Sequence, residues 1–188
     1  MYHVKYLTCL SETMLNAKAL SQLLNENVHP VLYPKWFIIT PNGTLIAYST
    51  PASTAELRQQ AALVSSTWKD QETRVRSAPL QDATTPQSSS QQLQALTIET
   101  PTATIIAKPI QPRLLLVLVA PLPEGTAHGR TDASEFTVHA ERVDDDRYPQ
   151  ETGKLSLLEK QRAKVDNGVV MIKEELTRRG FDMPEGVD

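Results

Sequence analysis

The sequence lacks several features that define whole classes of protein. Its 188 residues include one cysteine, Cys9, which excludes an internal disulfide framework and a zinc site built from several cysteines. The longest apolar run, Leu114 to Ala120, is far too short to cross a bilayer. No long apolar stretch opens the chain, so we expect no signal peptide. The net charge of -3 argues against a general nucleic-acid binder. We therefore expect a cytosolic protein that meets membranes only through a partner.

Aromatic residues are also scarce, with two Trp, five Tyr and three Phe, whereas proline is frequent at 13 residues. This balance indicates that part of the length lies outside a packed core. Two stretches fit that description. Residues 77–92 contain one large apolar side chain, Leu80, and residues 121–153 carry eight acids against three arginines. The first buries too little apolar surface to repay the entropy of ordering. The second is longer than an ordinary connection, which indicates a functional or a disordered segment. We expect both to be loop expansions.

Between these loops the chain alternates helical and strand patterns. Apolar residues at helical spacing predict a first helix over 14–25, capped by Thr13 or Ser11. Two strand-like runs, 36–40 and 44–50, flank Pro41-Asn42-Gly43, a sequence typical of a tight hairpin turn.

The second helix has the clearest start signal, because Ser53 and Glu56 have the spacing of a capping box. Its apolar residues form a narrow seam spaced by four, three and four, which suits packing against another helix; they are Leu57, Ala61, Val64 and Trp68. The small residues Ala62 and Ser65 beside the seam would permit close approach. The alternative, that the seam covers the domain's own sheet, remains open.

Three strand patterns follow, at 93–100, 102–110 and 113–120. The last is apolar on both faces, which predicts an interior strand with helices above and below. A final helix is expected over 155–179, with Gly168 weakening it slightly and Gly180-Phe181 ending it. Short links between consecutive strands predict an α+β protein with a largely antiparallel five-stranded sheet.

No catalytic constellation can be assembled from these residues. The four histidines, His3, His29, His128 and His139, are scattered and lack metal-ligand spacing. Residues 144–146 are consecutive aspartates without the spaced ligands of a calcium loop. We predict no catalytic residues, no metal and no cofactor. Lysines at 154, 160, 164 and 173 have the spacing of a solvated helix face, with contact to an acidic partner or an anionic membrane as the alternative.

Three segments together resemble the roadblock family. They are Leu15 to Leu24, the hairpin Ile38 to Ser49 containing Leu-Ile-Ala-Tyr-Ser, and the helix end Ser65-Ser66-Thr67-Trp68. The resemblance covers about 14–120 and 154–178. Within the family they are similar to the branch of the smaller roadblock subunit of Ragulator, the late endosomal and lysosomal adaptor of MAPK and mTOR signalling, of the fungal type.

The resemblance implies a profilin- or longin-like α/β sandwich with sheet order 2-1-5-4-3. It also implies that two such domains pair through their third strands, edge to edge, with the second helices side by side. An exposed edge strand offers unpaired backbone groups to another chain, which makes this pairing physically reasonable. The expected interface residues in this chain are Leu57, Ala61, Val64, Ser65, Trp68, Leu93, Ala95 and Leu96.

Functionally, the resemblance implies a non-enzymatic scaffold that takes part in nutrient signalling to the TOR kinase. Its partners would be a second roadblock protein, Rag-type GTPases and a lipid-anchored scaffold chain, on the late endosomal, lysosomal or vacuolar surface. Any guanine-nucleotide exchange would belong to the assembly. Pairing as a heterodimer is expected, with a homodimer left open.

Two alternatives remain. One is a roadblock module of the dynein light chain type or a homodimeric GTPase regulator. The other is a GTPase-activating protein that uses Arg130 or Arg142. In each case we divide the chain into an N-terminal extension (1–12), a roadblock domain (13–180) with a low-complexity loop (72–92) and an acidic insert (121–153), and a tail (181–188).

Overall fold

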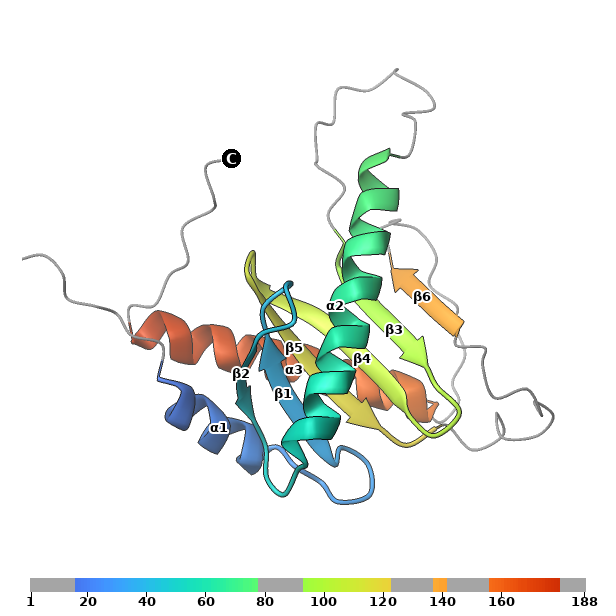
Figure 1. The fold of residues 1–188 in the computed structure, drawn as a ribbon. Coiled ribbons are helices and arrows are strands. Elements are labelled where there is room, and N and C mark those ends of the chain that lie inside the picture. Colours follow the sequence, from blue (N-terminus) through green and yellow to red (C-terminus); the bar gives the residue numbers. More distant parts are fainter. Residues whose placement is uncertain (1–15, 78–92, 123–136, 142–155, 180–188) are drawn as a thin grey trace, which may run out of the picture.

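The computed structural model describes residues 16–77, 93–122 and 156–179, together with the backbone of 137–141. In this part of the chain, six strands form one antiparallel sheet in the order β2-β1-β5-β4-β3-β6 (Figure 1). The elements are α1 (Ala17–Glu26), β1 (Lys35–Ile39), β2 (Leu45–Tyr48), α2 (Thr54–Ser77), β3 (Ala95–Glu99), β4 (Thr104–Gln111), β5 (Leu114–Ala120), β6 (Thr137–Glu141) and α3 (Leu157–Arg178).

The predicted fold class and the order 2-1-5-4-3 are confirmed. The five predicted strands form in this order, and β6 adds a sixth strand beside β3. It lies in the acidic insert, 121–153, which was expected to be loop throughout. The β6 strand was not predicted because the insert as a whole has few apolar residues. A five-residue edge strand depends more on backbone partners than on a hydrophobic face.

Helices cover both faces of the sheet (Figure 1). Of the helices that the structure describes, α1 and α3 pack on one face and α2 packs on the other. The β5 strand serves both layers: Leu114, Leu116 and Leu118 point to the α1–α3 side, whereas Leu115 and Val117 point to the α2 side. All seven residues of β5 are buried, which explains why its sequence is apolar without alternation.

The β1–β2 hairpin forms at the predicted turn. Gly43 has φ +84°, a conformation that most residues avoid, and its N–H donates to the Thr40 carbonyl at 2.8 Å. The Thr40 N–H in turn donates to the Thr44 carbonyl at 2.9 Å. The turn therefore closes as the Asn-Gly pair predicts.

The start of α1 and the end of α2 differ from the predicted helix boundaries. The α1 helix begins at Ala17, where the Asn16 side chain accepts a hydrogen bond from the Ala19 N–H at 3.0 Å. The predicted caps Thr13 and Ser11 lie outside the described residues, as do Gly180 and Phe181. The α2 helix continues to Ser77, so residues 72–77, which were predicted to belong to the loop, are helical, and the rest of that stretch lies outside the described residues.

The predicted capping box at the start of α2 forms only in part, and a complete box that was not predicted forms at α3. At the start of α2, Ser53 Oγ accepts from the Glu56 N–H at 3.5 Å, but the Glu56 carboxylate pairs with Lys35 instead of completing the box. A complete box forms at α3, where Ser156 and Glu159 each accept from the other's backbone N–H. A charged neighbour brought by the fold competes for Glu56, and the local motif cannot reveal it.

Candidate partner interface

The eight predicted interface residues are all buried within the single chain, at 0–6% exposure. Leu57, Ala61, Val64 and Trp68 face the sheet from α2, and they share a core cluster with Leu93 and Leu96. The open alternative, that the seam covers the domain's own sheet, therefore describes where these side chains lie. In this conformation a partner would contact the surface around these residues and not their buried side chains.

Ser65 and Ala95 have particular positions. Ser65 Oγ donates to the Pro41 carbonyl at 2.5 Å, and a Cβ placed on Gly43 would lie 3.3 Å from the Ser65 Cβ. Ser65 thus joins α2 to the hairpin turn, and its small size permits that approach. Ala95 opens β3 and pairs through its backbone with Glu141 of β6.

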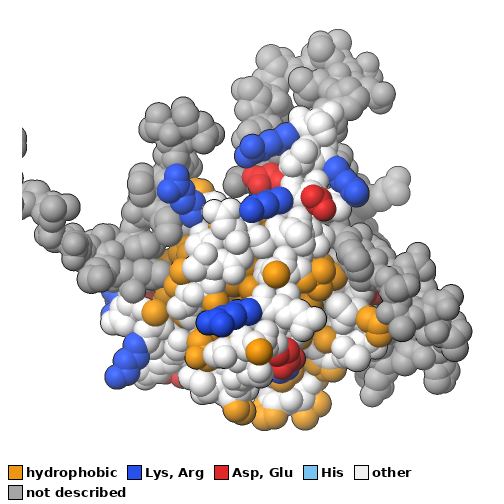
Figure 2. Space-filling view, viewed as in Figure 1, with side chains coloured by type: hydrophobic (Ala, Val, Ile, Leu, Met, Phe, Trp, Pro, Cys, Tyr) orange, Lys and Arg blue, Asp and Glu red, His pale blue; other side chains and the backbone are white. Residues whose placement is uncertain are grey.

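The outer side of α2 is exposed above this layer. Its exposed positions at helical spacing are Ala55, Gln59, Ala62, Ser66, Lys69 and Thr73, of which Lys69 is the one charged member. Figure 2 views the molecule from this side and shows charged side chains of both signs along the helix, with hydrophobic side chains beside it. Ala62 and Ser66 are small enough for a second helix to approach α2 closely between these charges.

The two outermost strands of the five-stranded core, β2 and β3, are covered in different ways. At β2, the outward Tyr48 N–H donates to Ser21 Oγ at 3.3 Å, and the Thr50 N–H just beyond the strand donates to Asn25 Oδ1 at 2.7 Å. Ser21 and Asn25 lie one turn apart on α1. At β3, the edge is closed by β6, paired from Ala95↔Glu141 to Glu99↔Thr137. Side chains seal the first edge, whereas backbone pairing with β6 covers the second.

Titratable side chains make local contacts. His29 accepts from the Leu32 N–H through Nδ1 at 3.2 Å and bridges to Tyr33 through the backbone. Lys164 donates to Asn27 Oδ1 at 2.9 Å and lies 6.0 Å from the centre of the Tyr33 ring. Among the described residues, no three His, Cys, Asp or Glu side chains come together as a metal site would need. His3, His128, Cys9, Lys154 and residues 144–146 lie outside the described part.

Within the described segments, the carboxyl of Glu175 has a pKa that departs clearly from its ordinary value. Hydrogen bonds from Arg179 and then Arg178 hold the pKa of the Glu175 carboxyl below its usual value of 4.5. These three residues form a charged cluster in the last turn of α3. Arginines there also suit the negative end of the helix dipole, so the cluster has a structural role at this helix end.

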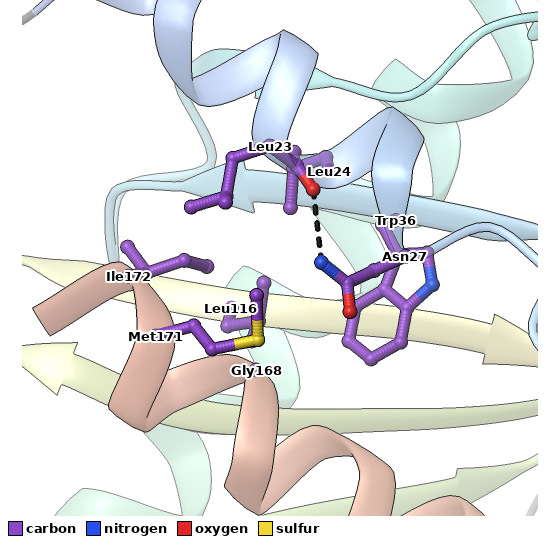
Figure 3. Close-up of a pocket in the computed structure, with 8 residues that line it drawn as sticks. All are labelled: Leu23, Leu24, Asn27, Trp36, Leu116, Gly168, Met171 and Ile172. Carbon is purple, nitrogen blue, oxygen red and sulfur yellow. Dashed lines mark hydrogen bonds between the residues drawn. The ribbon is translucent and has the colours of Figure 1, made fainter. Parts of the chain in front are cut away.

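A shallow apolar pocket lies between α1 and α3 (Figure 3). Asn27 is its polar member, and the Asn27 amide donates to the Leu23 carbonyl at 3.0 Å. Gly168 lines its floor: a Cβ there would lie 3.1 Å from a Leu116 methyl and 3.4 Å from the Trp36 ring. The predicted weak point of α3 is therefore a place where the helix packs tightly on side chains of the sheet. The pocket lies where α1 and α3 pack against each other.

No helix in the described segments is long and apolar enough to cross a membrane.

Comparison with known proteins bears on the fold. No family model and no curated protein sequence matches the chain. Among solved structures, MglB of Myxococcus xanthus superposes with a TM-score of 0.52 at 7% identity, over 87% of this chain and 99% of that one. The chain has the roadblock fold.

Two further neighbours of this fold are more partial. An MglB structure described as tetrameric aligns with 59% of this chain and 78% of its own, at 16% identity and a TM-score of 0.44. A roadblock/LC7 domain from Streptomyces avermitilis aligns with 54% and 77%, at 12% identity and a TM-score of 0.41. At such identities the likeness concerns the roadblock fold and leaves partners and activity to be inferred.

Proposed function

We propose that this chain is a non-enzymatic adaptor that pairs with a second roadblock-fold chain and, in that pair, holds a small GTPase of the Rag type. Following the sequence resemblance, the pair belongs to a Ragulator-like complex. A lipid-anchored scaffold chain places it on the lysosomal or vacuolar surface, where it supports TOR signalling in response to nutrients. Any effect on nucleotide exchange comes from the whole complex.

The observation that carries the proposal is the unequal covering of the sheet. Among the described elements, two helices cover one face and only α2 covers the other, and its outer side carries the small residues Ala62 and Ser66 between charged neighbours such as Lys69. Beside it lies β3, the outermost strand of the five-stranded fold and one end of the order 2-1-5-4-3. A second chain of this fold could therefore add a helix beside α2 and a strand beside β3 together.

The buried seam supports this surface from below. Leu57, Ala61 and Trp68 fix α2 against the sheet, so the outer residues of the helix are presented in a rigid arrangement. Preorganisation of this kind lowers the entropy lost on association. We therefore propose that the eight predicted interface residues contribute to partner binding indirectly, by holding rigid the outer surface that contacts the partner.

The test uses surface positions, since changing the buried seam would disturb the core. Introducing two bulky charges, Ala62→Arg with Ser66→Arg, should reduce association with a roadblock partner at least about tenfold, because desolvating unpaired charges is costly. The matched control is Val170→Arg, at an exposed position of α3 on the opposite face. Association is measured by calorimetry and folding by circular dichroism. Full binding by the folded double variant would contradict the proposed surface.

The identity of the partner needs a second experiment. Affinity purification from the native cell, followed by mass spectrometry, should recover a roadblock chain, Rag-type GTPases and a lipidated scaffold. Recovery of dynein intermediate chain would instead favour the light-chain alternative. Stimulated GTP hydrolysis by the purified chain alone would favour the GTPase-activating alternative, whose candidates Arg130 and Arg142 lie outside the described residues.

A further inference from the structure

The sixth strand occupies the edge that the proposed partner would use. Five residue pairs join β6 to β3 in regular antiparallel register, and Figure 1 shows β6 at the outer margin of the sheet. The β6 strand comes from the insert between β5 and α3. Its backbone therefore takes the place beside β3 that a strand from another chain would need.

The β3 strand underneath is well suited to receive a strand. Four of its five side chains, Ala95 to Ile98, are buried, and Glu99 is its one charged residue. It contains no proline or lysine, and its ladders with β4 and β6 have no register shift. Natural edge strands usually contain a proline, a lysine or a β-bulge, each of which prevents pairing with other chains. Without β6, β3 would present a flat, regular row of unpaired backbone groups.

The β6 strand is also the least embedded strand of the described sheet. Its main contact within the described residues is with β3, whereas β4 and β5 have strands on both sides and α3 packed against them. A strand attached along one side of a sheet opens at a lower free energy than interior strands. Because residues 121–136 and 142–156 join it to the fold, it competes for the edge as an intramolecular ligand at high effective concentration.

We propose that β6 is an in-chain substitute for a partner strand: it pairs with β3 in the free chain and is displaced by the edge strand of a second roadblock-fold chain when the pair forms. The partner's identity rests on the proposed function, but the occupation of the edge does not. If the edge is free about one-tenth of the time, β6 lowers the apparent affinity for the partner about tenfold. The insert that carries β6 would then control the affinity of this chain for its partner chain.

The test removes the β6 ladder with the variant Val138→Pro with His139→Pro. Consecutive N–H groups of a strand point to opposite sides, so one of the two prolines removes a hydrogen bond to β3 in either register. The matched control, Asp145→Pro with Asp146→Pro, places the same change in the insert but outside β6. Hydrogen exchange should show the outward β3 amides exchanging at least about tenfold faster in the β6 variant and unchanged in the control.

Affinity for the roadblock partner decides the proposal. We expect the β6 variant to bind about tenfold more tightly than the natural chain, and the control to bind equally. Weaker binding would overturn the proposal, because the partner would then add to the outer side of β6. Unchanged binding would overturn it too. A second variant, lacking residues 137–141, should give the same result if the prolines disturb folding.

The two proposals can fail separately. If no roadblock partner binds either form, the proposed function fails, but the edge can still be examined with the chain alone. In sedimentation, the β6 variant should self-associate more strongly than the natural chain, because its exposed β3 edges pair with each other. Unchanged exchange at β3 together with unchanged self-association would show that β6 does not occupy this edge.

Discussion

The two outermost strands of the five-stranded core, β2 and β3, are covered by different means. In the α1 half, made of β2, β1 and β5, Ser21 and Asn25 of α1 accept hydrogen bonds from the outward N–H groups of Tyr48 and Thr50. In the β6 half, made of β4, β3 and β6, a strand from a distant insert covers β3 through its backbone. The first closure is made by side chains of α1, a helix whose Leu20 and Leu24 are buried in the core, and the second is made by a strand added from the insert.

This difference indicates which of the two strands, β2 or β3, could more easily exchange its present neighbour for a strand of another chain. Opening the β2 edge would require α1 to leave, and with it Leu20 and Leu24, which are buried in the core between α1 and α3. Opening the β3 edge would require one short strand to leave while β3 stays paired with β4. The α1 half is thus built for stability, and our proposal places the entry of a partner strand in the β6 half, where less of the described core would have to open.

The largest expected effect tests how tightly the α1 half is packed. Gly168→Leu should lower the free energy of unfolding by about 1–3 kcal/mol, because the new side chain must displace Leu116 and Trp36 beneath α3. The gain in helix propensity, about 0.7 kcal/mol or more, offsets only part of this loss. Urea denaturation gives the difference. Val170→Leu, at a position that is 53% exposed on the same helix, should change stability little.

A Gly168→Leu protein as stable as the natural one would mean that α3 can shift on the sheet. The contrast between a rigid α1 half and an exchangeable β6 half would then lose its basis.

The second prediction concerns the β2 edge itself. Ser21→Ala with Asn25→Ala removes both acceptors, leaving the N–H groups of Tyr48 and Thr50 to water. We expect a loss of about 1–2 kcal/mol, since each net hydrogen bond contributes about 1 kcal/mol. Gln22→Ala, an exposed change on the same helix, controls for the higher helix propensity of alanine. Thermal or urea unfolding measures the difference.

If the double alanine variant keeps its stability, then side chains of α1 do not seal this edge. Faster exchange of the Thr50 amide without loss of stability would place the effect on local opening alone.

Sequence reasoning recovers the α1 half better than the β6 half. The hairpin is predictable because Asn42-Gly43 specifies its turn locally, and β5 because its unbroken apolar run requires cover on both faces. The β6 strand is missed because its five residues have neither turn signals nor a long apolar pattern, and its partner β3 lies far away in the sequence. Pairing between distant strands is a property of the fold.

The candidate interface shows the same limit. The spacing of Leu57, Ala61, Val64 and Trp68 identifies one face of α2, but a stripe that packs on the domain's own sheet has the same spacing as one that packs on a partner helix. The structure places this stripe inward. The outer surface, with Ala62 and Ser66, has no apolar pattern, so its small residues become meaningful only when the opposite side of α2 is known to be buried.

The smallest expected effect separates charge from packing in the α1 half. Arg179 and Arg178 hold the pKa of Glu175 below its usual value, so the folded protein favours the ionised carboxylate. The resulting stability is present in full above the usual pKa of 4.5 and is lost as the pH falls through the lowered pKa of the folded protein. Glu175→Gln should therefore be slightly less stable than the natural chain at pH 7, and the difference should vanish in strong acid.

Thermal melting of both proteins at pH 7 and pH 3 measures this difference, and a carboxyl titration followed by NMR reports the pKa directly. Glu174→Gln, the adjacent exposed acid, is the matched control for losing one negative charge. Added salt should shrink the Glu175 effect, because exposed ion pairs are screened. A difference that persists in acid or in high salt would show that Glu175 acts through packing beside Leu176, and the end of α3 would then belong with the rigid core of the α1 half.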